Sequence, residues 1–114
     1  MESGAIAYCG KSAADNLALL RQAKAWDFWL HLKDFPGAHA IVHRKRDQLI
    51  PDNELLQVSE WLAHESLSEK SLYPGQKLAV VVVETRFVRP IKGDKLGRVT
   101  YHSEGTLFLT LRHE

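Results

Sequence analysis

Residues 27–46, DFWLHLKDFPGAHAIVHRKR, decide the fold that we predict for this chain. Apolar residues alternate with polar or aromatic ones along residues 28–32, which is the two-residue period of a β-strand. Pro36 and Gly37 fit the central positions of a type II turn, because proline presets φ and glycine accepts a positive φ. A second strand over residues 38–43 would then return antiparallel. The stretch therefore predicts a β-hairpin.

Helical patterns flank this hairpin on both sides. A short strand over residues 6–9 precedes a helix over residues 12–24, with Ser12 as its N-cap. A second helix is expected over residues 51–67, because Pro51 suits the first helical turn and leucine and valine recur at helical spacing.

The C-terminal part reads as strands. Residues 78–83 are apolar without interruption, which is typical of a central strand covered on both faces, and the strand continues to about Val88. Two more strands are expected over residues 99–102 and 107–111, joined by a turn at 103–105. The order is β-α-β-β-α-β-β-β. We predict an α+β fold, with a mostly antiparallel sheet of about five to six strands and two principal helices packed on one face.

The totals describe one ordinary domain, and we expect residues 1–114 to form it. The net charge of +1 at pH 7 gives no overall basicity that would announce a nucleic-acid partner. The one cysteine, Cys9, excludes an intramolecular disulfide and suits a reducing, cytoplasmic setting. The N-terminus has no signal-peptide pattern, and the longest apolar run is too short to span a bilayer, so no membrane partner is expected.

The histidines of the central stretch raise the question of a metal site. His31, His39 and His43, with Asp34, offer imidazole and carboxylate ligands. On the predicted hairpin His39 and His43 share one face, whereas His31 is expected on the other. No closely spaced zinc motif is present. We therefore interpret these histidines as hydrogen-bonded or exposed side chains and predict no metal.

Catalytic patterns are weaker still. Cys9 precedes a glycine at a strand-to-helix turn, where a helix N-terminus can lower the pKa of a thiol. Nothing in the sequence places a histidine beside it, so a small buried residue is the better interpretation. Nucleophile-elbow, P-loop and dinucleotide-binding motifs are absent. We predict no catalytic residue and no cofactor, and the chain is expected not to be an enzyme.

Basic residues cluster locally although the total charge is small. Five recur at every third position, with Asp94 as the one acid across residues 85–103: Arg86, Arg89, Lys92, Lys95 and Arg98. A second cluster follows the hairpin at Arg44, Lys45 and Arg46. If both meet at one edge of the sheet, they form the positive surface that binds phosphate. Aromatic residues nearby offer stacking platforms or belong to the core: Trp26, Phe28, Trp29 and Phe35.

The central stretch is similar to a known motif. DFWLHLKDFPGAH resembles the pattern D-x-W-x-H-x-K-D-x-P-G-S-H of the NFACT-R domain, the RNA-binding module at the C-terminal end of NFACT proteins. The matching positions are Asp27, Trp29, His31, Lys33, Asp34, Pro36, Gly37 and His39. The resemblance extends from about residue 8 to the C-terminus. It includes Gly10-Lys11, Asp15-Asn16 and the segment VVVVETRFVRPIKGDKLGRVTY at residues 80–101.

The resemblance implies a role in translation. NFACT proteins act in ribosome-associated quality control, where they hold tRNA on a large ribosomal subunit that carries a stalled chain. It therefore implies contact with tRNA or ribosomal RNA, and with the large subunit as a candidate partner. The other NFACT domains have no room in 114 residues, so we expect a stand-alone version or a fragment. Ala38 replaces the usual serine, and Leu96 stands where a proline is common.

A set of site residues follows from the basic clusters and the resemblance. We expect Asp34 to pair with His39 across the turn and to keep the imidazole partly protonated. Asp34, Pro36 and Gly37 are expected to structure that turn. The predicted RNA-binding residues are Lys11, His31, Lys33, His39, Arg44, Lys45, Arg46, Arg89, Lys92, Lys95 and Arg98.

Three functions remain open from the sequence. The first is a non-catalytic RNA-binding domain. The second is a protein-interaction module that docks on a ribosomal or translation-associated protein through its aromatic residues. An enzyme that modifies RNA is the third, and it trails the others because no cofactor motif is present.

Overall fold

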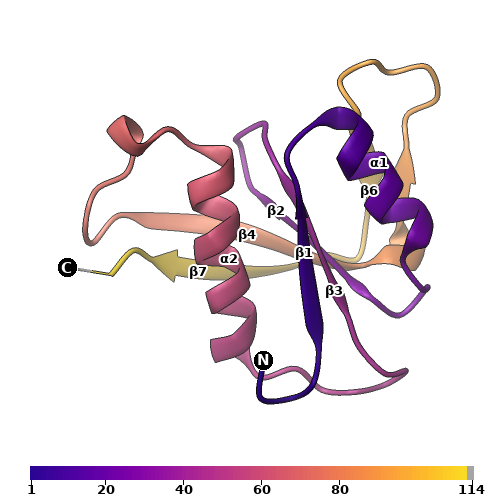
Figure 1. The fold of residues 1–114 in the computed structure, drawn as a ribbon, viewed down its shortest axis with the longest axis horizontal. Coiled ribbons are helices and arrows are strands. Elements are labelled where there is room, and N and C mark those ends of the chain that lie inside the picture. The colour runs from indigo at the N-terminus through magenta and orange to yellow at the C-terminus, as the bar shows by residue number, and fades with distance from the viewer. Residues whose placement is uncertain (113–114) are drawn as a thin grey trace.

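The computed structural model describes residues 1–112 and contains two α-helices and seven strands. The elements follow the predicted order, except that the strand expected from residue 78 to about Val88 is divided into two (Figure 1). Their bounds are β1 Ile6–Gly10, α1 Ala13–Gln22, β2 Phe28–Leu32, β3 His39–His43, α2 Asp52–Ser66, β4 Lys77–Glu84, β5 Val88–Pro90, β6 Val99–Tyr101 and β7 Gly105–Thr110. The α+β class is confirmed.

Five strands form one antiparallel sheet in the order β1-β3-β2-β4-β7. The predicted hairpin is its centre: Trp29 of β2 lies opposite Ile41 of β3 and Val83 of β4. β2 is therefore a central strand, paired on both edges. Its alternate side chains point to opposite faces of the sheet.

The two helices cover opposite faces of the sheet, not the single face that we expected. Leu30 and Leu32 pack with Val58 and Leu62 of α2 in one core. Trp29 belongs to a second core on the other face, against which α1 packs. The physical reason is the pleat: residues 28–32 are apolar at every position except His31, so both faces of the strand are buried, and each takes its own helix.

The helix ends follow the local sequence rules. Ser12 caps α1, because its side-chain oxygen accepts a hydrogen bond from the backbone N–H of Asp15 at 3.1 Å. Pro51 precedes the first turn of α2, as predicted. Neither helix within residues 1–112 has the length and apolar character needed to cross a membrane.

The apolar run that begins at residue 78 is divided in two. β4 ends at Glu84, a short 3₁₀ turn follows over Thr85–Phe87, and β5 begins at Val88. β5 pairs with β6 in a separate two-stranded sheet, so β6 does not form the expected hairpin with β7. β7 pairs instead with β4. The β5–β6 hairpin therefore stands apart from the main sheet and carries the loop of residues 91–98.

The tip of the central hairpin also differs from the prediction. The turn lies at Lys33 and Asp34, and Asp34 takes the positive φ of 67°. Pro36 and Gly37 follow in irregular backbone. Gly37 is required for another reason: a Cβ there would lie 2.7 Å from the Cβ of Ser66 in α2. Close approach to the helix end, and not a type II turn, explains this glycine.

Candidate functional site

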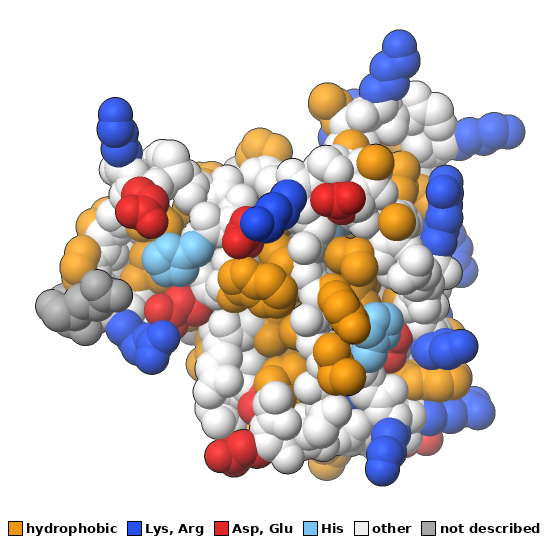
Figure 2. All heavy atoms as spheres, viewed as in Figure 1, with side chains coloured by type: hydrophobic (Ala, Val, Ile, Leu, Met, Phe, Trp, Pro, Cys, Tyr) orange, Lys and Arg blue, Asp and Glu red, His pale blue; other side chains and the backbone are white. Residues whose placement is uncertain are grey.

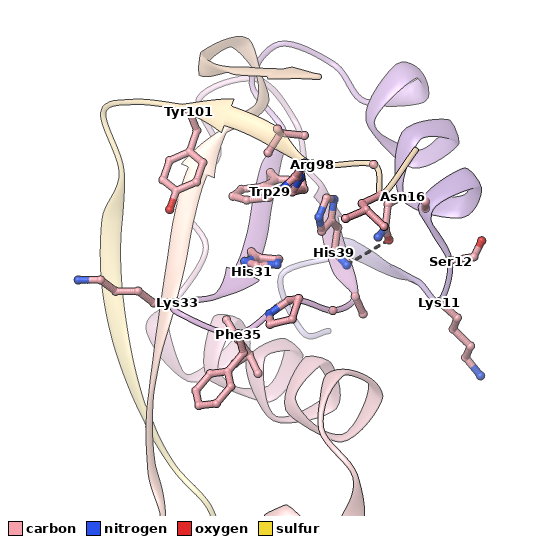
Figure 3. Close-up of a pocket in the computed structure, with 18 of the residues that line it drawn as sticks. Lys11, Ser12, Asn16, Trp29, His31, Lys33, Phe35, His39, Arg98 and Tyr101 are labelled. Atoms are coloured by element: carbon pink, nitrogen blue, oxygen red, sulfur yellow. Dashed lines mark hydrogen bonds between the residues drawn. The ribbon is translucent and has the colours of Figure 1, made fainter. Parts of the chain in front are cut away.

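A cleft of about 810 Å³ opens where the tip of the hairpin, the start of α1 and the β5–β6 hairpin converge (Figure 3). This volume is in the range of small-ligand sites. Its lining residues come from segments distant in the sequence and include Lys11, Ser12, Asn16, Trp29, His31, Lys33, Asp34, Phe35, His39, Leu96, Gly97, Arg98 and Tyr101. The cleft is the one place where most of the predicted motif meets.

Four aromatic rings pack together at the floor of the cleft. Trp29 stacks on His31, with ring centroids 5.5 Å apart and an interplanar angle of 7°. His39 meets Trp29 edge-on at 5.1 Å, and Tyr101 of β6 meets it at 5.3 Å. Trp29 itself is 1% exposed, whereas Tyr101 is 36% exposed. The floor is thus a rigid aromatic surface with one accessible tyrosine.

The two histidines of the floor are uncharged at neutral pH. Burial, and to a smaller extent the neighbouring His31, lower the pKa of His39 to about 4. Burial also lowers the pKa of His31. Asp34 is exposed and makes no hydrogen bond or ion pair with His39 among the described residues. The expected Asp34–His39 pair and a partly protonated His39 were therefore wrong, because desolvation outweighs a carboxylate that lies in solvent.

His39 is held by its backbone. Its N–H donates to the side-chain oxygen of Asn16 at 3.1 Å, and Asn16 is buried in the first half of α1 (Figure 3). Gly10 makes room for this contact, since a Cβ at residue 10 would lie 2.3 Å from the same oxygen. Asn16 therefore ties α1 to the start of β3 and fixes the floor of the cleft against the helix start.

The wall formed by residues 91–98 is seated on the same helix. Gly97 has a φ of 70°, and a Cβ there would lie 3.0 Å from the Cβ of Ala13. The loop thus approaches α1 as closely as a glycine permits. Arg98 follows and pairs with Asp94 at 2.6 Å, which also lowers the pKa of that carboxyl through the Arg98 hydrogen bond.

Cations surround the cleft while the floor is neutral. Lys11 and Lys33 line it, and Lys92 and Lys95 belong to the loop that forms its wall. Lys11 has a long, exposed ion pair with Glu65 at 3.6 Å, which solvent weakens. With Arg98 these are five cations, and the carboxylates of the same region are those of Asp15, Asp34, Glu65 and Asp94. The predicted residues that the fold brings into the lining of the cleft are Lys11, His31, Lys33, His39 and Arg98, and the loop beside it carries Lys92 and Lys95.

The second basic cluster lies elsewhere. Arg44, Lys45 and Arg46 follow β3 at the end opposite His39, so they do not join the cleft. Arg44 is engaged in the fold: its Nε donates to the Trp26 carbonyl at 2.7 Å, and its guanidinium lies over the Phe28 ring. Figure 2 shows lysine and arginine side chains spread along one edge of the molecule, from the β5–β6 loop to the loop after β3. The two clusters are neighbours on one edge and do not merge.

Arg89 and His43 also take positions outside the cleft lining. Arg89 lies on β5 and donates to the carbonyl of Arg86 at 2.8 Å. His43 lies four residues along β3 from His39, and its Nδ1 meets Asp27 Oδ2 at 2.7 Å. His31 and His39 share a face after all, with rings 5.1 Å apart, which the hairpin register explains. The three histidines do not converge on one point.

Several cleft residues were not among the predicted site residues. Trp29 was named only as one of four aromatic residues that could stack or be core, and the structure makes it both. Asn16 and Tyr101 appeared only as matched positions of the motif. The sequence signal that could have indicated Asn16 is a polar residue in the first turn of the helix that follows Gly10-Lys11. Nothing local in the sequence indicates Tyr101, because a separate sheet carries it to Trp29.

The fold and the cleft together define a class of molecule: a small α+β domain with a neutral aromatic floor and a cationic border. Such a site suits a ligand that combines a planar group with negative charge, because the rings offer stacking and the lysines offer charge neutralisation.

Sequence comparison gives relatives for this domain. The chain is 32% identical over 110 residues to the Rqc2 homolog RqcH of Bacillus subtilis (strain 168), and 31% identical over 107 residues to the Rqc2 homolog RqcH of Streptococcus suis (strain 05ZYH33). These alignments cover 95% and 92% of the chain and 18% of each relative. No family model matches the chain. The similarity supports an NFACT-related domain.

A solved structure has the same fold. The C-terminal part of the fibronectin/fibrinogen-binding protein from Streptococcus suis matches with a TM-score of 0.78 at 29% sequence identity. The match covers 97% of this chain and 43% of that one. The fold of the chain thus recurs as one part of a longer protein.

Proposed function

We propose that this chain is an NFACT-R domain that binds RNA through the aromatic cleft, without catalysing a reaction. The observation that carries the proposal is the combination of an uncharged aromatic floor with a border of exposed cations in one cleft. RNA offers the matching pair of groups, planar bases and phosphates. No catalytic step is needed to account for this arrangement.

The similarity to Rqc2 homologs indicates which RNA and which cellular process to propose. The chain aligns with 18% of RqcH, and its central motif resembles the NFACT-R pattern, so we propose that its RNA is tRNA or ribosomal RNA in ribosome-associated quality control. The large ribosomal subunit is the proposed partner, and the cytoplasm is the proposed location. These assignments follow the relatives and belong to the proposal.

Charge reversal on the cleft wall tests the proposal. The variant Lys92→Glu/Lys95→Glu/Arg98→Glu should reduce the affinity for tRNA or ribosomal RNA by at least tenfold, because three cations of the cleft region are replaced by three carboxylates. Binding is measured by filter retention at low and moderate salt. Co-sedimentation with large ribosomal subunits gives the second readout.

A matched control lies on another part of the surface. Lys70→Glu/Lys77→Glu/Arg112→Glu also reverses two lysines without an ion pair and one ion-paired arginine, since Arg112 meets Glu60 at 3.0 Å. Those residues belong to the region around β4 and the segment before it, away from the cleft lining. Equal losses in both variants, or none in the first, would contradict RNA binding at the cleft.

A protein-interaction module is the second candidate. It is favoured by large apolar side chains on the surface, of which Phe108 on β7 is 74% exposed. The solved structure that shares the fold is described as part of a fibronectin/fibrinogen-binding protein. Salt separates the two candidates: phosphate binding weakens linearly on a log–log plot as salt rises, whereas apolar docking responds little.

A further inference from the structure

We infer that the cleft takes one unpaired nucleotide, with its base on the exposed Tyr101 ring beside Trp29 and its phosphate at the N-terminus of α1. This inference rests on the proposed RNA binding and names the form of RNA: a single strand or an unpaired base, as opposed to a double helix. Three independent features of the cleft support it.

The floor selects a planar and uncharged group. Because burial keeps His31 and His39 neutral, the rings present aromatic faces and edges with no charge of their own. Tyr101 is the accessible ring, and it packs against Trp29 at 5.3 Å. A base can therefore stack on Tyr101 and reach the side of Trp29. In a double helix both faces of every base are already stacked, so only an unpaired base can do this.

Two polar atoms at the floor await a partner. Trp29 Nε1 and His39 Nδ1 are buried and have no hydrogen-bond partner among the described residues. Their side chains are 1% and 6% exposed and both line the cleft. Buried donors and acceptors are normally satisfied, so each is expected to meet a hydrogen-bonding group when the cleft is filled. A base edge carries such groups, and it reaches these atoms after a side-chain shift at the cleft surface.

The start of α1 provides the phosphate position. The helix has ten residues, and the first amide groups of a helix have no acceptor within it. That of Asp15 donates to Ser12 Oγ, and the Asp15 carboxylate accepts the Lys11 N–H at 3.4 Å, so the phosphate position is at the Ala13 and Ala14 amides. Ala13 is among the residues that line the cleft. Figure 3 shows Lys11 and Ser12 at the start of the helix. Helix N-termini favour anions through these amides and the helix dipole. Lys33, on the hairpin tip, is placed to neutralise a second phosphate of the same strand.

The decisive measurement compares RNA forms. The full chain is titrated with a single-stranded RNA of about ten nucleotides, a length typical of such sites, and with the same RNA annealed to its complement. A third probe is the single strand with abasic sugars at several positions. We expect the intact single strand to bind about tenfold more tightly than the duplex or the abasic strand.

Two variants test whether the aromatic floor of the cleft causes the preference for single-stranded RNA. Tyr101→Ala should remove most of the single-strand preference, and because this side chain is partly exposed the variant is expected to fold. Trp29→Phe keeps a ring but removes Nε1, and should weaken single-strand binding about fivefold. Trp61→Phe, an exposed tryptophan on α2, is the matched control and should change nothing. Circular dichroism verifies folding of each variant.

The outcomes separate this inference from the proposed function. Single strand and duplex bound equally, with Tyr101→Ala unchanged, would overturn the unpaired-base site and leave RNA binding intact. No binding of either RNA would overturn both. Abasic RNA bound as tightly as intact RNA would show that phosphates alone are recognised, and would also overturn the base site.

Discussion

At the scale of single residues, the fold depends on one buried carboxylate whose two oxygens are both hydrogen-bonded. Asp27 is 0% exposed, and its carboxylate accepts the backbone N–H groups of Lys24 at 2.8 Å and Arg44 at 3.1 Å, besides meeting His43. A buried carboxylate survives only with such partners. Asp27 therefore locks the start of β2 to the end of β3, on the side of the hairpin opposite the cleft.

Replacing Asp27 by asparagine should destabilise the protein. Asn has nearly the same shape, but its NH₂ group would face a donor, so one buried hydrogen bond becomes a donor–donor contact. We expect the free energy of unfolding to fall by about 2 kcal/mol, as measured by urea denaturation. Asp34→Asn, an exposed carboxylate on the hairpin tip, should change it by less than about 0.5 kcal/mol. A D27N variant as stable as wild type would contradict this role.

The depressed pKa of His39 makes stability depend on pH. The folded-state pKa of about 4 lies below the unfolded value near 6.5, so the unfolded chain binds the proton first. Stability from this group is fully present above about pH 6.5 and is lost as pH falls toward 4, by about 3 kcal/mol in total. Urea denaturation at a series of pH values measures it.

The variant His39→Gln isolates this effect, because it removes the titrating group. Its stability should change less between pH 7 and pH 4.5 than that of wild type, by roughly 2 kcal/mol. His102→Gln, which alters an exposed histidine, should follow the wild-type profile. Parallel profiles for wild type and His39→Gln would show that His39 is not desolvated.

At the scale of elements, the cleft depends on how the β5–β6 loop is seated against α1. Gly97 and Gly93 belong to the same loop and both have a positive φ, 70° and 77°. They differ in their surroundings: a Cβ at residue 97 would press on Ala13, whereas a Cβ at residue 93 would meet nothing within 4 Å. Comparing substitutions at these two glycines therefore distinguishes the effect of backbone strain from the effect of the steric contact with Ala13.

Gly97→Ala should therefore lower RNA affinity more than Gly93→Ala. Both variants carry the same strain of an L-residue at positive φ, of order 1 kcal/mol. Only Gly97→Ala displaces the wall of the cleft from the helix. We expect an additional loss of about threefold to tenfold in affinity, read by the same filter assay, because a small misplacement weakens several contacts together. Equal affinities would mean that the loop position is irrelevant to binding.

At the scale of the whole molecule, folding separates the basic residues into two groups. Lys92 and Lys95 are exposed on the loop that forms the wall of the cleft, while Lys45 and Arg46 lie beyond the opposite end of β3. Arg46 rests over the Trp26 ring at 5.6 Å. Their common edge gives the molecule a positive side despite a net charge of +1 (Figure 2).

Salt dependence should distinguish these groups. Each phosphate contact with single-stranded RNA contributes about 0.7 to the slope of log affinity against log salt. Lys92→Gln/Lys95→Gln should reduce the slope by about 1.4 if both lysines contact phosphate. Lys45→Gln/Arg46→Gln should leave it nearly unchanged. The reverse result would move the RNA site from the cleft to the loop after β3.

Local patterns were sufficient for most elements. The alternation over residues 28–32, the Ser12 cap and Pro51 predicted elements that the structure contains, because these features depend on neighbours within a few residues. The prediction that both helices pack on one face of the sheet was wrong, because a strand that is apolar on both sides does not indicate which helix covers which face. The turn at residues 33–34 was missed, because Gly37 was taken as a turn residue. This glycine is instead required by the close approach of Ser66 in α2, which is distant in sequence.

The sequence by itself determined the α+β order and the central hairpin, since both follow from short-range periodicity and residue type, and it carried the motif from which most of the cleft floor is built. Only the tertiary structure decided that His31 and His39 are neutral, that Tyr101 joins Trp29, and that the two basic clusters stay apart. Burial and the pairing of distant strands set these properties. A charge or a ring acquires its chemical role from what surrounds it in space.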